Sequence, residues 1–204
     1  MKAKEVPNHY FQAVSSATGA IGAYEVNSEL IRMKYTDKRT AIHMIQNYPF
    51  NPIVDAWHST TNELKKLSAV EVKQFYDQIY AKVLANTNPP CHNKGGIYEV
   101  LSSSNGDAYS VTNQEVKPAQ QEWQTFATVN LDPAALVALV GLIKAVKSGT
   151  VQKHESVMLH LTGGGLEQSI NVNNLKPVIP DISVENTQVS HAITRVRHYL
   201  STIH

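Results

Sequence analysis

The sequence predicts an α/β protein built on a partial parallel sheet flanked by helices. Short apolar runs rich in β-branched and aromatic residues, each bounded by turn or small residues, predict buried strands. They occupy residues 9–14, 41–45, 107–112, 126–131 and 156–162. Longer stretches with helical spacing lie between them. Because strands that alternate with helices pair in parallel, these observations together indicate the α/β class.

The predicted elements follow one another along the chain. The strand at residues 9–14 leads into a helix that we expect to begin near Gly19. Residues 69–85 place apolar side chains at roughly the 3.6-residue period of a helix. A further long helix is bounded by Asp132 as N-cap and Gly149 as its stop signal, with a proline in its first turn. We expect one α/β region and a helical tail beyond it.

Composition and charge exclude several classes of protein. The chain has 204 residues, of which 42% are hydrophobic and 17% charged, enough to bury an ordinary core. Its formal net charge of +1 provides no broad positive field, so we expect no nucleic-acid partner. No apolar run approaches the roughly 20 residues of a membrane span, and the opening MKAKEVPNHY lacks the apolar segment of a secretory signal. We therefore expect no membrane association and a cytoplasmic location.

Cys91 is the single cysteine of the chain and cannot form an internal disulfide, which agrees with a reducing compartment. His92 follows it directly. Adjacency in sequence does not create the geometry that activates a thiol, so we expect an incidental thiol rather than a nucleophile.

Ligand sites in parallel α/β sheets lie at the carboxyl ends of the strands. Two stretches of the sequence fit this pattern. The first is HYFQAVSSATGAIGAYE, residues 9–25, a strand followed by small and hydroxylated residues and then a helix. Ser15, Ser16 and Thr18 offer hydroxyls, and the N–H groups from Ser16 to Ala20 would face an anion at the helix N-terminus. The pattern alone leaves an ordinary strand-to-helix turn open as the alternative.

The second stretch is LHLTGGGLEQ, residues 160–169. Thr162 stands at a strand end and is followed by Gly163, Gly164 and Gly165. Glycines permit positive φ angles and let a ligand approach the backbone closely. A tight turn explains three glycines equally well.

Six stretches, taken together and in order, resemble one enzyme family. They are HYFQAVSSATGAIGAYE, MIQNYPFNPIVDAW, NKGGIYEVL, DAYSVTNQEV, LDPAALVALVGLIKAVKSG and SVMLHLTGGG. The chain resembles the C-terminal half of the threonine synthase and cysteate synthase group, pyridoxal-phosphate enzymes of the tryptophan synthase β-subunit fold, known as fold type II. The resemblance implies an α/β cofactor-binding half-domain of the large domain over residues 1–180, a helical tail over 181–204, pyridoxal 5'-phosphate as cofactor and an amino acid as substrate.

The same resemblance implies roles for the two stretches. The cofactor phosphate is assigned to the loop Ser15, Ser16, Ala17, Thr18, Gly19 and Ala20. The pyridine nitrogen is assigned to the hydroxyl of Thr162, with Gly163 and Gly164 letting the backbone pass beside the ring. A neutral hydroxyl leaves that nitrogen unprotonated, which limits carbanion character and favours β- or γ-replacement or elimination on the substrate side chain.

The chain departs from the family pattern in the first loop. The family loop reads close to GSGTGG, whereas this sequence has SSATGA, so Ser15, Ala17 and Ala20 stand at glycine positions. A residue other than glycine costs about 1 to 2 kcal/mol wherever the backbone must be left-handed. The N–H donors survive the substitutions.

The family also forms a Schiff base through a lysine of its N-terminal half, and that motif is absent from this sequence, so we expect no catalytic residue here. Lys94 and Lys153 are the lysines nearest in sequence to the family-like stretches, and we expect both to be solvated loop lysines. Three hypotheses follow: half of an enzyme whose lysine comes from a partner polypeptide, a catalytically inactive relative that acts as a binding or regulatory partner, and a structural homo-oligomer of half-domains.

Overall fold

The computed structural model describes residues 5–59, 63–164, 179–183 and 189–202. The chain divides into two compact units, Met1–Gln168 and Ser169–His204. In the second unit the described secondary structure is the helix α8 (Val189–Thr202). The predicted boundary near residue 180 stays a prediction.

A four-stranded parallel sheet forms the centre of the first unit, in the order β3-β2-β1-β4. Its strands are β1 (His9–Ala13), β2 (Ala41–Asn47), β3 (Asp107–Val111) and β4 (Val157–His160). In register, His9 pairs with Ala41 on one side and with Val157 on the other. Strands β1 and β2 are almost wholly buried, as expected of a parallel sheet covered on both faces.

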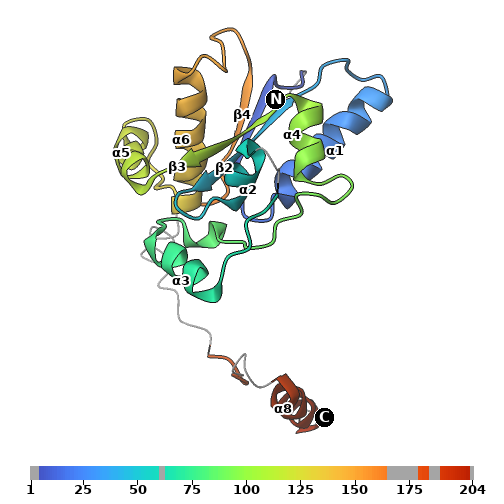
Figure 1. Ribbon diagram of the computed structural model, residues 1–204, viewed down its shortest axis with the longest axis vertical. Helices are drawn as coiled ribbons and strands as arrows, with labels where there is room; N and C mark the ends of the chain where they lie inside the picture. The colour runs from blue at the N-terminus through green and yellow to red at the C-terminus, as the bar shows by residue number, and fades with distance from the viewer. Residues whose placement is uncertain (1–4, 60–62, 165–178, 184–188, 203–204) are drawn as a thin grey trace. The chain divides into compact units, whose positions relative to one another are not determined.

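Helices cover the sheet on both faces, as Figure 1 shows. One face, with Tyr10 and Ile42, packs against α1 (Thr18–Arg32), α2 (Pro52–His58) and α4 (Ile97–Ser104). The other, with Phe11 and Ile45, packs against α5 (Asn113–Gln124) and α6 (Pro133–Lys147). The predicted α/β class with a parallel sheet flanked by helices is thereby confirmed.

Helix α6 has the bounds that its sequence signals predict. Asp132 is the N-cap residue, and Gly149 has a φ of 80°, the left-handed conformation in which glycine commonly ends a helix. Gly141 brings the helix close to the sheet, because a Cβ at this position would lie 2.9 Å from Cγ2 of Ile45.

The helix predicted over residues 69–85 is shorter in the structure. Helix α3 (Ala69–Gln78) ends where the chain turns inward, and a short 3-10 turn, η1 (Lys82–Leu84), follows. The buried Asn47 side chain accepts hydrogen bonds from the N–H groups of Tyr80 (3.0 Å) and Ala81 (2.9 Å). These bonds replace the intrahelical ones, so a tertiary contact overrides local helix propensity.

The strand predicted at residues 126–131 does not form. The indole of Trp123 donates to the carbonyl of Val129 (2.7 Å) and Phe126 N–H bonds back to the Trp123 carbonyl (2.9 Å), so the chain turns here. The Phe126 side chain is 85% exposed. The segment keeps one isolated bridge to the sheet end, between Leu131 and Gly164.

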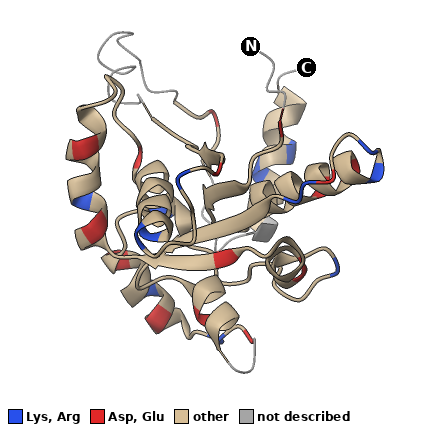
Figure 2. Cartoon of the chain, turned by 90° about the horizontal axis from the view of Figure 1, so that it is seen from above, with Lys and Arg blue, Asp and Glu red and all other residues tan. Residues whose placement is uncertain are grey.

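Charged residues of both signs are interspersed over the helices in Figure 2. Among the described residues, no helix is long and apolar enough to cross a membrane.

Candidate functional site

The two sequence stretches that predict a site meet at one edge of the sheet. Strands β1 and β4 are parallel neighbours, with Gln12 opposite His160. Because the carboxyl ends of parallel strands share an edge, the segments that follow them, residues 14–20 and 161–164, emerge side by side. The structure thus brings the predicted phosphate loop to the same edge as Thr162.

Ala17 gives the first loop its shape. It is the N-cap residue of α1 and has a φ of 62° and a ψ of 9°, a left-handed conformation that is rare for residues other than glycine. Its side chain is buried, with 3% exposure. At position 17 the backbone therefore has a conformation that glycine adopts without strain, although the residue is alanine.

The N-terminus of α1 presents donors that no described side chain caps. The first intrahelical bond of this turn runs from Ile21 N–H to the Ala17 carbonyl (2.9 Å), so the N–H groups of Thr18, Gly19 and Ala20 precede it. No acidic residue lies in the first turn. The positive end of the helix dipole and these N–H groups suit an anion, and the fit extends to a phosphate group.

The hydroxyls of this loop pair with each other. Ser16 Oγ and Thr18 Oγ1 lie 2.9 Å apart, and both residues are exposed. Ser15 is half-buried and Ala20 is fully buried against the sheet. Because one of the two hydroxyl protons of Ser16 and Thr18 is used in their mutual bond, the other is left to donate to a ligand.

The glycine stretch after β4 has a packing role. A Cβ on Gly163 would meet the carboxylate of Asp132, and one on Gly164 would lie 2.8 Å from the Asn130 carbonyl. The Gly163 carbonyl also accepts from Asp132 N–H (3.2 Å). Close approach to the segment before α6 thus requires bare backbone, while Thr162 stays exposed at the sheet edge. The predicted Gly165 lies outside the described residues.

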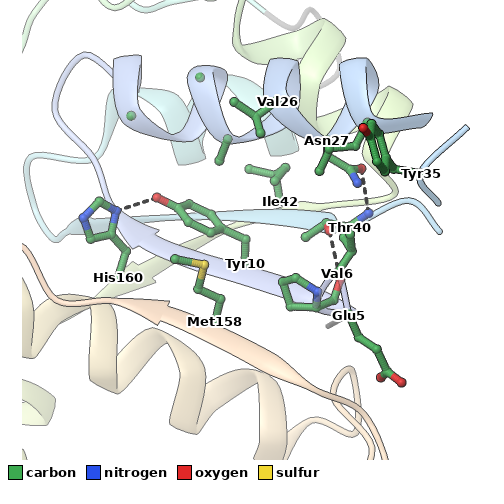
Figure 3. Close-up of a pocket in the computed structure, with 15 residues that line it drawn as sticks. Glu5, Val6, Tyr10, Val26, Asn27, Tyr35, Thr40, Ile42, Met158 and His160 are labelled. Carbon is green, nitrogen blue, oxygen red and sulfur yellow. Dashed lines mark hydrogen bonds between the residues drawn. The ribbon is translucent and has the colours of Figure 1, made fainter. Parts of the chain in front are cut away.

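Sequence reasoning missed a polar cluster beside the loop. The Tyr10 hydroxyl donates to Gln12 Oε1 (2.9 Å) and lies 2.5 Å from His160 Nδ1. Figure 3 shows the contact between Tyr10 and His160. One phenolic proton cannot serve both partners, so Nδ1 of His160 donates to the phenol oxygen. The Gln12 amide in turn covers Gly19, where a Cβ would lie 2.7 Å from its nitrogen.

Burial raises the pKa of Tyr10 to about 12, which keeps the phenol protonated at neutral pH. The protonated phenol of Tyr10 and the Gln12 amide are therefore a hydrogen-bonded support for Gly19. The sequence does place Tyr10 and Gln12 two residues apart, which puts both side chains on one face of a strand. That His160 joins them follows only once β4 is known to pair with β1.

The remaining candidates are exposed loop lysines and inert groups. Lys94 and Lys153 are exposed, as the sequence predicts. Cys91 is buried, and burial raises its thiol pKa to about 11, which leaves it unsuited as a nucleophile. The ring of His92 stacks on Tyr98. Within the described part of the chain, no group of three or more acidic, histidine or cysteine residues is placed to hold a metal ion.

No protein-family model matches the chain. It is 35% identical over 190 residues to a cysteate synthase of Methanoregula boonei, a match that spans 92% of this chain and 45% of that protein. It is 32% identical to a cysteate synthase of Methanosarcina barkeri, over 91% of this chain and 47% of the relative. The chain therefore spans less than half the length of the curated relatives it matches.

A solved structure agrees with this similarity in fold. The processed form of threonine deaminase isoform 2 from Solanum lycopersicum superposes with a TM-score of 0.55, at 15% identity, over 84% of this chain and 45% of that one. The chain corresponds to the C-terminal half of a fold type II pyridoxal-phosphate enzyme. By this resemblance, pyridoxal phosphate is the cofactor expected for the fold that the chain shares.

The uncapped α1 N-terminus is compatible with that cofactor. The N–H groups of Thr18, Gly19 and Ala20 suit its phosphate, and the exposed Thr162 hydroxyl emerges from the neighbouring strand.

Proposed function

We propose that this chain supplies the phosphate site and the pyridine-nitrogen partner of a pyridoxal-phosphate enzyme that carries out β- or γ-replacement or elimination on an amino acid. The observation that carries the proposal is the uncapped N-terminus of α1 at the same sheet edge as the end of β4. Helix N-termini with free N–H groups are favourable sites for phosphate. The similarity to cysteate synthases over nine-tenths of the chain supports the same assignment.

When bound, pyridoxal phosphate draws electrons from the bonds at the substrate α-carbon. The residues of this chain bind and orient it. The N–H groups of Thr18, Gly19 and Ala20 hold the phosphate, with the Ser16 hydroxyl as a further donor. The Thr162 hydroxyl donates to the ring nitrogen and leaves it without a proton, which favours reactions on the substrate side chain.

We assign the lysine that holds the cofactor covalently to a polypeptide equivalent to the N-terminal half of the relatives. The two lysines nearest the candidate segments, Lys94 and Lys153, are exposed in loops. The alternative function is that of a catalytically inactive relative that binds or regulates a partner, and the alanine at position 17 favours it.

The experiment tests the phosphate site with a matched pair of variants. The chain is coexpressed with the part of the Methanoregula boonei cysteate synthase that it does not match, and binding of pyridoxal phosphate and of pyridoxal, which lacks the phosphate, is measured by absorbance. Thr18→Glu places a carboxylate among the α1 donors, whereas Thr87→Glu changes an exposed threonine in a different loop, outside the α1 turn. We expect Thr18→Glu to weaken pyridoxal phosphate binding at least ~tenfold, a loss of about 1.4 kcal/mol, without affecting pyridoxal.

We expect the Thr18→Glu variant to fold, because a carboxylate in the first turn stabilises a helix. A loss of binding therefore reports on the site and not on unfolding. Equal weakening for both ligands, or equal binding by both variants, would remove the phosphate assignment. Borohydride reduction followed by mass spectrometry adds a second measurement. We expect the cofactor adduct on a lysine of the coexpressed half. A single stoichiometric adduct on this chain contradicts the division of the site, and an absence of bound cofactor favours the inactive relative.

A further inference from the structure

A small pocket lies at the carboxyl end of β2, where the turn after this strand meets α2, α3 and the loop between these helices. Its volume is about 160 Å³. Sites for drug-sized ligands occupy about 300 to 1,000 Å³, so this pocket fits a smaller molecule. Phe50, Leu67 and Phe75 form apolar walls, and the polar lining includes Asn51.

The Asn51 side chain has a buried oxygen without a hydrogen-bond partner. The residue is 4% exposed, and its Nδ2 donates to Oδ1 of Asp55 at 2.8 Å. Because a carboxylate accepts hydrogen bonds and does not donate them, this bond fixes the orientation of the amide and leaves Asn51 Oδ1 unpaired. A buried acceptor without a donor destabilises a fold. The Asn51 oxygen therefore offers a place for an N–H donor of a ligand.

Helix capping does not explain this asparagine. Asn51 is the N-cap residue of α2, yet its side chain accepts no bond from the helix. The N–H groups of Ile53 and Val54 bond instead to Oε1 of Gln46, at 2.8 and 3.4 Å. The first turn of α2 is thus satisfied from β2, and the usual partners of an N-cap oxygen are taken.

The pocket lining carries one charge of each sign, Asp55 and Lys65. Lys65 is exposed, and its Nζ pairs with Glu71 Oε1 at 3.2 Å, a surface pair that contributes little to stability and can exchange for a ligand. Desolvation raises the pKa of Asp55, and the charge of Lys65 acts in the opposite direction. A simple anion would be repelled by Asp55 and a simple cation by Lys65. A zwitterion satisfies both residues.

We infer that this pocket binds a free α-amino acid with a small apolar side chain. The ammonium group donates to the Asn51 oxygen and to the Asp55 carboxylate, and the α-carboxylate accepts from Lys65. The apolar side chain packs against Phe50 and Phe75. The inference goes beyond the proposed function and does not depend on it, because none of these residues is among those assigned to the cofactor.

The first part of the test compares three probes on the full chain by isothermal titration calorimetry. L-Valine carries both charges, 3-methylbutanoate lacks the ammonium group, and 2-methylpropylamine lacks the carboxylate. All three have the same branched apolar end. We expect L-valine to bind with a dissociation constant at or below about 1 mM, an affinity that a ligand of this size can reach. Each probe with a single charge should bind at least about tenfold more weakly, because one charged hydrogen-bond partner is lost.

The second part locates the site with two matched pairs of variants. Asp55→Asn removes the anion and keeps the shape of the side chain, whereas Asp37→Asn changes an exposed aspartate outside the pocket. Lys65→Met removes the cation, whereas Lys66→Met changes its exposed neighbour. We expect the first member of each pair to weaken L-valine binding at least about tenfold and the second to leave it unchanged. Circular dichroism melting checks that all four variants fold.

Amide chemical shifts provide an independent map of the contact. With L-valine bound, the signals of residues 50–55 and of Phe75 should move. The inference is overturned if L-valine shows no saturable binding, if removal of either charge leaves the affinity unchanged, or if the members of a pair bind alike. Shifts confined to another face of the chain overturn it as well. Because neither pyridoxal phosphate nor a second polypeptide is present, these results are independent of the proposed function.

Discussion

Ala17 holds a left-handed backbone with its methyl group buried, and the competing energies can be compared. Replacement by glycine relieves about 1 kcal/mol of backbone strain, but loses about 0.8 kcal/mol of buried methyl and adds about 0.4 to 1 kcal/mol of unfolded-chain entropy. We expect Ala17→Gly to change the free energy of unfolding by less than about 1 kcal/mol, as measured by urea denaturation.

Valine at the same position should behave differently, because a β-branched residue is strongly disfavoured at positive φ and the site is already filled. We expect Ala17→Val to destabilise the chain by at least about 2 kcal/mol in the same urea experiment. An Ala17→Val protein as stable as the wild type would show that position 17 is not held in the left-handed region.

His43 predicts a pH dependence of stability. Its ring is 1% exposed, stacks on Phe11 with 4.3 Å between ring centroids, and lies 3.0 Å from Nδ1 of His9 through its Nε2. Burial, and secondly the charge of His9, lower the pKa of His43 to about 3. An unfolded histidine titrates near pH 6.5, so between these values the unfolded chain binds the extra proton.

The stability from His43 is therefore present above about pH 6.5 and lost as the pH falls toward 3. We expect the free energy of unfolding to drop by about 2 kcal/mol between pH 7 and pH 5 through this group. His43→Gln should lose that part of the drop. Glu155, whose oxygen lies 3.1 Å from His9 Nε2, has a lowered pKa and stays ionised over this range. Identical pH profiles for the two proteins would contradict the assignment.

At the scale of elements, two helical glycines make opposite predictions. Gly22 in α1 faces open space, whereas a Cβ on Gly141 in α6 would press on Ile45 of β2. We expect Gly22→Ala to stabilise the chain by about 0.5 to 1 kcal/mol through helix propensity. We expect Gly141→Ala to destabilise it by about 1 to 3 kcal/mol through overpacking. Thermal melting of the two variants checks the signs, and a shift in the same direction for both would contradict this picture of the α6 interface.

The helices and strands also show how much of the fold can be predicted from the sequence alone. Four of five expected strands and the α6 boundaries follow from local patterns, because these segments satisfy their own propensities. The end of α3 does not, since Asn47 bonds to residues 80 and 81 from a distant strand. The cluster of Tyr10, Gln12 and His160 likewise depends on which strand lies beside β1, which no local pattern specifies.

For the molecule as a whole, the candidate site follows the same division. The meeting of residues 15–20 and Thr162 at one edge was predictable, because the rule for parallel strand ends points to one edge, while their roles toward a cofactor stay predictions. The left-handed backbone of Ala17 and the contact between Tyr10 and His160 were not predictable, because both arise from packing between elements. The candidate site lies at the carboxyl edge of the sheet, and among the described residues the outer strands β3 and β4 each pair with one strand.

The strand order has a consequence for how the chain acquires its structure during synthesis. Strand β1 is made before β2, β3 and β4, yet one of its two neighbours is β4, and the bond between Asn8 and Ser156 at their start joins residues 148 apart in sequence. Contacts between such distant segments form slowly, because the long intervening loop must close first. During synthesis, β2, β3 and their helices therefore leave the ribosome before β4, the second neighbour of β1, has been made. Until then one side of β1 is unpaired and accessible to a chaperone.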